Sequence, residues 1–127
     1  MPYPTTPDYG VSLTGPVTPF PAFHQPTDAP VLGPDPIVGA DGTVTYDGLD
    51  TLVLRWAGPW EPAWLESLVD TWQAAQAAGG RAQVRYYSDR DAAMTTQTGV
   101  PLRPTYAYRS GLYVYDLEWV IQGLGLI

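Results

Sequence analysis

Residues 61–80 read EPAWLESLVDTWQAAQAAGG, and this stretch decides the fold. Its apolar residues recur at spacings of three and four, which predicts an amphipathic helix from about Glu61 to Ala78. Pro62 suits the first turn, where its missing N–H is harmless, and Gly79-Gly80 supplies a left-handed stop. The apolar stripe consists of Trp64, Leu65, Leu68, Val69, Trp72 and Ala75. A single helix with one apolar stripe needs a sheet to cover.

The residues before this helix have the composition of strands. Thr43–Tyr46 and Thr51–Trp56 are rich in β-branched, aromatic and aliphatic side chains. Asp47-Gly48 lies between them and predicts a hairpin, because both residues tolerate positive φ. The register of this hairpin stays open, since loops of two or three residues are equally compatible with the sequence.

After the helix, Arg81–Tyr87 predicts a third strand with Ala82, Val84 and Tyr86 on one face. Ser88 to Arg103 is the least regular stretch. We expect a polar loop there, with a short helical turn that ends near Met94. Its threonines and glutamine make it a candidate contact surface.

The C-terminal part predicts a long hairpin. Thr105–Arg109 pairs with the residues from Leu112 onward across Ser110-Gly111. This loop sets tyrosines opposite each other, Tyr108 with Tyr113 and Tyr106 with Tyr115. The same face continues with Leu117, Trp119 and Ile121, and the other face is mixed.

Strands joined by tight turns form an antiparallel sheet, and the helix covers one of its faces. We therefore predict an α+β fold: an antiparallel β-sandwich or partly closed barrel, with one amphipathic helix at about 61–78 and a long extended proline-rich N-terminal arm. Residues 43–127 form the α+β domain and residues 1–42 form the arm.

The arm holds ten of the fourteen prolines, so neither a helix nor a central strand is expected in it. It also carries regularly placed aromatic and aliphatic residues, which disordered linkers usually lack. We expect the arm to dock on its own domain or on neighbouring subunits. Because proline cannot donate to a strand ladder, docking through side chains should dominate.

Composition excludes several classes of function. Only 15% of residues are charged, and the net charge is −7, with six arginines and no lysine, so nucleic-acid binding is not expected. There is no cysteine, which removes disulfides and thiol chemistry. The N-terminus does not have the pattern of a secretory signal, and no apolar run is long enough to span a membrane.

The sequence contains few side chains in patterns that are typical of an active site. His24 is the only histidine and lies on the proline-rich arm, a poor platform for a base that must be held rigidly. Asp116 and Glu118 lie two apart on one strand, which favours a solvated face or partners among Arg55, Arg85 and Arg109. The alternative is a catalytic carboxylate pair of the kind that hydrolyses glycosides. The aspartates at 41–50, 89 and 91 fit turn chemistry, with a calcium site as the alternative. We predict no enzyme, no cofactor, no metal site and no small-molecule substrate.

Aromatic residues are abundant, with five Trp and nine Tyr, and they dominate protein–protein hot spots. The interface candidates are Tyr3, Tyr9, Phe20, Phe23, Trp60, Tyr87, Tyr106 and Tyr108. We expect protein partners, including other copies of the chain. The alternative is a carbohydrate-binding or adhesin-like module that uses Trp60 and the tyrosines as a stacking platform.

Residues 43–124 resemble structural proteins of tailed-bacteriophage virions, of the small tail-tip, tube-related or head–tail joining types. The segments that carry the resemblance are LVLRW, a helix ending in AAGG, AQVRYY, and the closing hairpin YAYRSGLYVYDLEWVIQGL. The resemblance implies a non-enzymatic subunit of a virion, assembled in the host cytoplasm. Such a subunit forms oligomers and contacts neighbouring virion proteins through its arm, its sheet edges and its aromatic surface.

Overall fold

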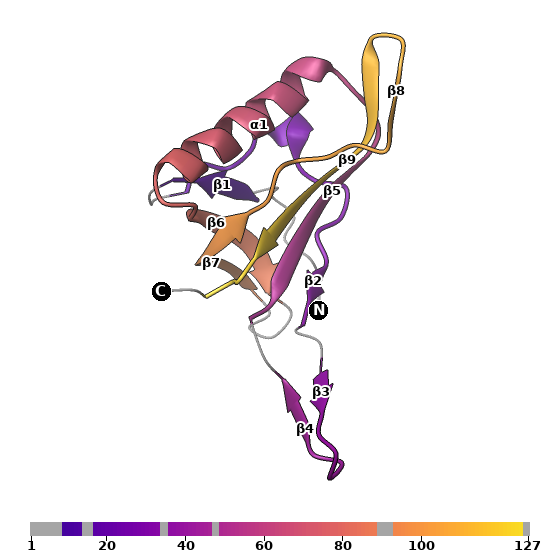
Figure 1. The fold of residues 1–127 in the computed structure, drawn as a ribbon. Helices are drawn as coiled ribbons and strands as arrows, with labels where there is room; N and C mark the ends of the chain where they lie inside the picture. Colours follow the sequence, from indigo (N-terminus) through magenta and orange to yellow (C-terminus); the bar gives the residue numbers. More distant parts are fainter. Residues whose placement is uncertain (1–8, 14–16, 34–35, 47–48, 89–92, 126–127) are drawn as a thin grey trace.

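The computed structural model describes residues 9–13, 17–33, 36–46, 49–88 and 93–125, and Figure 1 shows their arrangement. The main sheet contains β1 (Gly10–Ser12), β2 (Val31–Leu32), β5 (Thr51–Trp60), β6 (Ala82–Ser88), β7 (Ala93–Pro101), β8 (Tyr108–Ser110) and β9 (Tyr113–Gln122). A separate two-stranded sheet contains β3 (Pro36–Val38) and β4 (Val44–Tyr46). The helices are α1 (Pro62–Ala77) and a short 3-10 helix, η1 (Ala22–His24). The predicted α+β class, a mostly antiparallel sheet with one α-helix, is confirmed.

Helix α1 begins and ends close to its predicted bounds. Its C-terminus is closed by a glycine motif: the Gly80 N–H donates to the Ala75 carbonyl at 2.7 Å, and Gly79 and Gly80 both have positive φ. Trp64, Leu68 and Ala75 are buried in the core, as the apolar stripe predicts.

The core lies between α1 and one face of the sheet. Strands β5 and β9 pair along most of their length, and their register places large apolar residues directly opposite each other. The pairs are Leu52 with Ile121, Leu54 with Trp119, and Trp56 with Leu117, and all six side chains are buried. Ala82, Val84 and Tyr86 of β6 join the same core, so the predicted inward face of that strand is confirmed.

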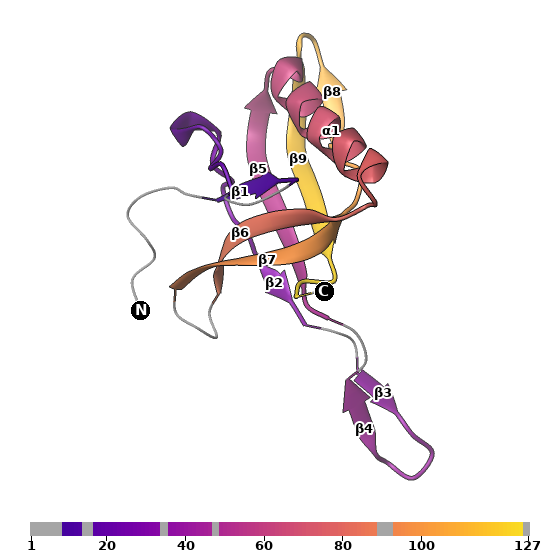
Figure 2. The ribbon, with the colours of Figure 1, turned by 90° about the vertical axis from the view of Figure 1, so that its left-hand side faces the viewer.

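Strand β7 joins two halves of the main sheet. Residues 93–99 pair with β6, whereas Val100 and Pro101 pair with β9. Figure 2 shows β6 and β7 running across the direction of β5 and β9. Gly99 lies at this change of partner, where a Cβ atom would come within 2.7 Å of Ile121 Cγ2. The corner therefore requires a residue without a side chain.

This strand corrects the expectation of an irregular polar loop. Residues 93–101 form a strand, and no helical turn ends at Met94. The threonines of this segment are β-branched and suit the pleated surface, so its polarity reflects partial exposure and not loop structure. Residues 89–92 lie outside the described residues.

The first predicted hairpin is also wrong. Thr43–Tyr46 contains β4, which pairs with β3 from the arm and not with β5. The β5 edge is taken instead by β2, with Val31 opposite Leu52. The turn signal at Asp47-Gly48 lies outside the described residues.

Arm residues form both edges of the main sheet. β1 pairs with β6, and β2 pairs with β5, so backbone hydrogen bonds hold the arm as well as side chains do. The prolines are compatible with this pairing. Pro30 has no N–H to donate, and its carbonyl accepts a hydrogen bond from the Val53 N–H at 3.0 Å. The expectation that side chains would dominate the docking therefore needs correction.

Candidate functional site

The hairpin of β8 and β9 extends beyond the body of the sheet, at the end of the molecule opposite the β3–β4 hairpin (Figures 1 and 2). Its register differs from the predicted one: Tyr108 pairs with Tyr115, and Ser110 pairs with Tyr113. The two-residue turn is therefore Gly111-Leu112. Gly111 has a φ of 61°, as a glycine at the first position of a type II′ turn requires. The predicted loop placed this glycine second.

Four large side chains at this end of the molecule are about half exposed or more exposed. Tyr106 is 43% exposed, Tyr108 53%, Leu112 80% and Tyr113 50%. We call these four residues the hairpin tip. Tyr108 stacks on Tyr115 with ring centroids 4.6 Å apart and planes 6° from parallel. A rigid aromatic pair beside exposed aliphatic and phenolic groups has the composition of a protein-binding hot spot.

A bulge between β5 and β9 changes which β9 residues face the core. The ladder shifts register between Trp56 and Pro59, opposite Asp116. Val114 and Leu117 are both buried, whereas a regular strand would place them on opposite faces. The expectation that Tyr113 and Tyr115 share the inward face of Leu117 is therefore wrong, and Tyr113 lies half exposed.

The β3–β4 hairpin extends from the opposite end of the molecule, as Figures 1 and 2 both show. Val38 pairs with Val44, and these side chains are 67% and 53% exposed. The turn carries Asp41, which accepts a hydrogen bond from the Thr43 N–H at 3.0 Å. This bond holds the pKa of the Asp41 carboxyl below its ordinary value. An isolated two-stranded hairpin gains little stability in water, so an apolar pair on it favours contact with another surface.

Several of the predicted interface aromatics instead anchor the arm to the core. Phe20 packs edge-on against Trp56 and Trp64, with centroid distances of 5.7 and 5.6 Å. Trp60 is half-buried and lies 5.5 Å from the His24 ring, and its indole N–H donates to the Ala57 carbonyl. Tyr9 also packs partly buried against the core.

The remaining candidates divide between surface and interior. Phe23 is 92% exposed, and Tyr106 and Tyr108 belong to the hairpin tip. Tyr87 is only 8% exposed, so its predicted place on the surface is wrong; it lies on β6 next to inward-facing Tyr86. Tyr3 lies outside the described residues. Four exposed residues were not among the predicted interface candidates: Leu112, Tyr113, Val38 and Val44. A turn with Gly111 in its first position would have predicted that Leu112 is exposed.

The groups considered for catalysis have structural partners. His24 Nε2 lies 3.2 Å from Glu61 Oε1, and its ring lies 4.5 Å from that of Trp64. Asp116 Oδ1 accepts from the Gly58 N–H at 3.0 Å, and Glu118 pairs with Arg55 at 3.4 Å. Arg55 is one of the predicted partners of these carboxylates, and the prediction is confirmed for Glu118.

Among the described residues, no three acidic or histidine side chains gather as metal ligands would, and none of the helices has the length and apolarity of a membrane span. Asp89 and Asp91 lie outside the described residues.

No protein-family model, curated protein or solved structure matches this chain.

Proposed function

We propose that this chain is a non-enzymatic structural subunit that works by binding other proteins, either copies of itself or neighbouring proteins of an assembly. The observation that supports this proposal is the hairpin tip. Leu112 is largely exposed, and three tyrosines beside it are about half exposed on the same extended hairpin. Exposed apolar side chains gathered in one place are typical of interaction sites.

In the setting that the sequence resemblance implies, the assembly is a tailed-bacteriophage virion, in the tail or head–tail region. The proposal includes the finer architecture: a sandwich-like sheet, and an N-terminal arm that helps to join subunits. The coiled sheet with its corner at Gly99 is compatible with the sandwich alternative.

The carbohydrate-binding alternative has less support. A sugar platform needs an open indole or phenol face, and Trp60 packs half-buried against His24. Tyr108 uses one ring face for its stack on Tyr115.

Sedimentation of an epitope-tagged chain from its native source tests the proposal. The chain has a mass of 13.8 kDa, and an assembled subunit should sediment with particles far heavier than this. Replacing Leu112 and Tyr113 together by Ser should move the chain to light fractions, while Gln76→Ala on the exposed side of α1 should leave it with the particles. A chain that sediments at its own mass in extracts that contain finished particles would contradict the proposal.

A further inference from the structure

The two extended hairpins of this chain carry opposite single charges. The segment 36–46 contains Asp41 and no basic residue, and the segment 105–115 contains Arg109 and no acidic residue. Both charged side chains are exposed, and neither forms a salt bridge with another described residue. Each hairpin therefore presents a charge that has no ionic partner among the described residues.

The opposite charges of the two hairpins match an uneven distribution of charge along the whole chain. Residues 1–54 contain six aspartates and neither Lys nor Arg, and all six arginines lie at or after residue 55. Residues 1–54, which include the arm, are thus the acidic part of the molecule. The rest of the chain is close to neutral, because its seven acidic residues are nearly balanced by those arginines.

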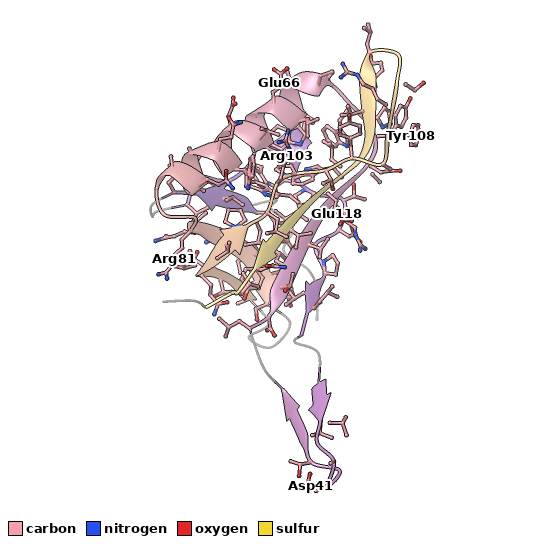
Figure 3. The ribbon with its side chains drawn as sticks, viewed as in Figure 1. Asp41, Glu66, Arg81, Arg103, Tyr108 and Glu118 are labelled. Atoms are coloured by element: carbon pink, nitrogen blue, oxygen red, sulfur yellow. The ribbon has the colours of Figure 1, made fainter. Side chains whose placement is uncertain are left out.

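Both hairpins also carry exposed apolar side chains beside the charge. On one, the Val38–Val44 pair lies close to Asp41 in sequence; on the other, Leu112 and Tyr113 lie close to Arg109. Figure 3 labels Asp41 at the tip of the β3–β4 hairpin and Tyr108 at the opposite end of the molecule. One chain can therefore contact a copy through each end at the same time.

We propose that the β3–β4 hairpin of one copy docks on the hairpin tip of the next, with Val38 and Val44 against Leu112 and Tyr113 and Asp41 beside Arg109. The contact is heterologous, because two different surfaces of the same chain meet. Repetition of it produces a ring where the rotation closes and a filament where it does not. This inference rests on the proposed function and names the partner as a second copy.

Asp41 is ionised near neutrality, as an ordinary aspartate is, and its lowered pKa extends this charge, and with it the proposed pairing, to lower pH. The apolar pair supplies the area removed from water, while the charges set orientation and partner choice. The β3–β4 hairpin also gains the packing partner that an isolated two-stranded sheet needs.

The test is sedimentation velocity of the purified full chain up to about 1 mM, a range that reveals weak association. Two variants are compared with the parent chain. Asp41→Arg makes both hairpins cationic, and Arg109→Asp makes both anionic. Each variant alone should associate about tenfold more weakly, because like charges then meet at the contact. Circular dichroism and tryptophan fluorescence check that each variant keeps the folded body, since both positions are exposed. Because Asp41→Arg also loses the turn bond to Thr43, recovery on mixing is the decisive observation.

An equimolar mixture of the two variants tests whether the β3–β4 hairpin of one copy contacts the hairpin tip of another. Every contact between unlike copies in the mixture joins a cation to an anion, so association should return to the parent level. Leu112→Ser should weaken association of the parent chain by a similar or larger factor, and Gln76→Ala on α1 should not change it. Electron microscopy of the associated species then separates rings from filaments.

Three results would overturn the inference: a parent chain that stays monomeric throughout, association that none of the hairpin variants changes, or variants that are both weakened and do not recover on mixing. A monomeric purified chain that still sediments with particles from its native source would place another protein on these hairpins, and the proposed function would stand. A chain that associates when pure and sediments at its own mass in those extracts would contradict the proposed function alone.

Discussion

Asp116 and Gly58 face each other across the bulge between β9 and β5, and the carboxylate of Asp116 accepts a hydrogen bond from the Gly58 N–H at 3.0 Å. Both have backbones in the left-handed region, with φ of 56° and 83°. Asp116 is the only non-glycine residue with positive φ among the described residues. Its short side chain tolerates this conformation because it can hydrogen-bond locally. The pair fixes the bulge that brings both Val114 and Leu117 into the core.

Substitutions at Asp116 should separate its two roles. Asp116→Asn retains an acceptor and tolerates positive φ, so stability should stay close to that of the parent chain. Asp116→Gly loses only the hydrogen bond and should cost about 1 kcal/mol. Asp116→Ala loses the bond and also strains the backbone, for a total of about 2–3 kcal/mol. Urea unfolding followed by tryptophan fluorescence measures the series, and an Ala variant as stable as the Asn variant would contradict this account.

Phe20 and Phe23 offer a matched pair of substitutions on the arm. Phe20 packs between Trp56 and Trp64, whereas Phe23 is 92% exposed. Phe20→Ala should reduce the free energy of unfolding by about 2–4 kcal/mol, through lost burial and a residual cavity. Phe23→Ala should change it by about 0.5 kcal/mol or less. Equal effects in chemical denaturation would show that the arm does not pack on the core in this way.

Gly99 should resist substitution for a steric reason. An added Cβ would meet Ile121 Cγ2 at 2.7 Å and the Gln122 carbonyl oxygen at 3.0 Å. Gly99→Ala should therefore cost about 1–3 kcal/mol by overpacking the corner. At Gly33 the nearest atom to such a Cβ is Asp50 Oδ1 at 3.9 Å, so Gly33→Ala serves as the control and should be nearly neutral. Thermal unfolding of both variants checks the difference, and a stable Gly99→Ala protein would rule out this corner geometry.

Asp41 should titrate below the ordinary range of an aspartate. Hydrogen bonds from the backbone and side chain of Thr43 favour its charged form and lower its pKa. A lowered pKa in the folded hairpin means that the turn is stabilised above the ordinary aspartate pKa and loses this contribution as pH falls through the lowered value. Thr43→Ala removes the side-chain bond and should move the pKa part of the way back. Carbon-13 NMR titration of the Asp41 carboxyl measures both values, and an identical midpoint in the two proteins would refute the role of the Thr43 hydroxyl.

The arm residues cannot be removed without loss of the main sheet's edges. Deleting residues 2–36 would remove β1 and β2, which form the two edges of the main sheet, together with Phe20 from the core contacts. Such a truncation should therefore unfold the domain, and it cannot by itself test assembly. Point substitutions on the hairpins avoid this difficulty because the altered side chains lie in solvent.

The sequence predicts those elements that depend only on residues close to one another in the chain. The helix from Pro62 to Ala77 follows from the spacing of Trp64, Leu68 and Ala75 and from the glycines behind it, because both features act within a few residues. The inward face of β6 follows from simple alternation. Among the site residues, the predicted exposure of Tyr106 and Tyr108 is confirmed.

By itself, the sequence determined the α+β class and the helix with its buried stripe. Only the tertiary structure decided which strands pair. The edges at β5 and β6 are filled by arm residues nineteen or more positions away, the corner at Gly99 depends on Ile121, and the bulge at Asp116 depends on Gly58. Pairing of this kind depends on contacts between distant segments and on the shape of the common core, and no local pattern of residues encodes either.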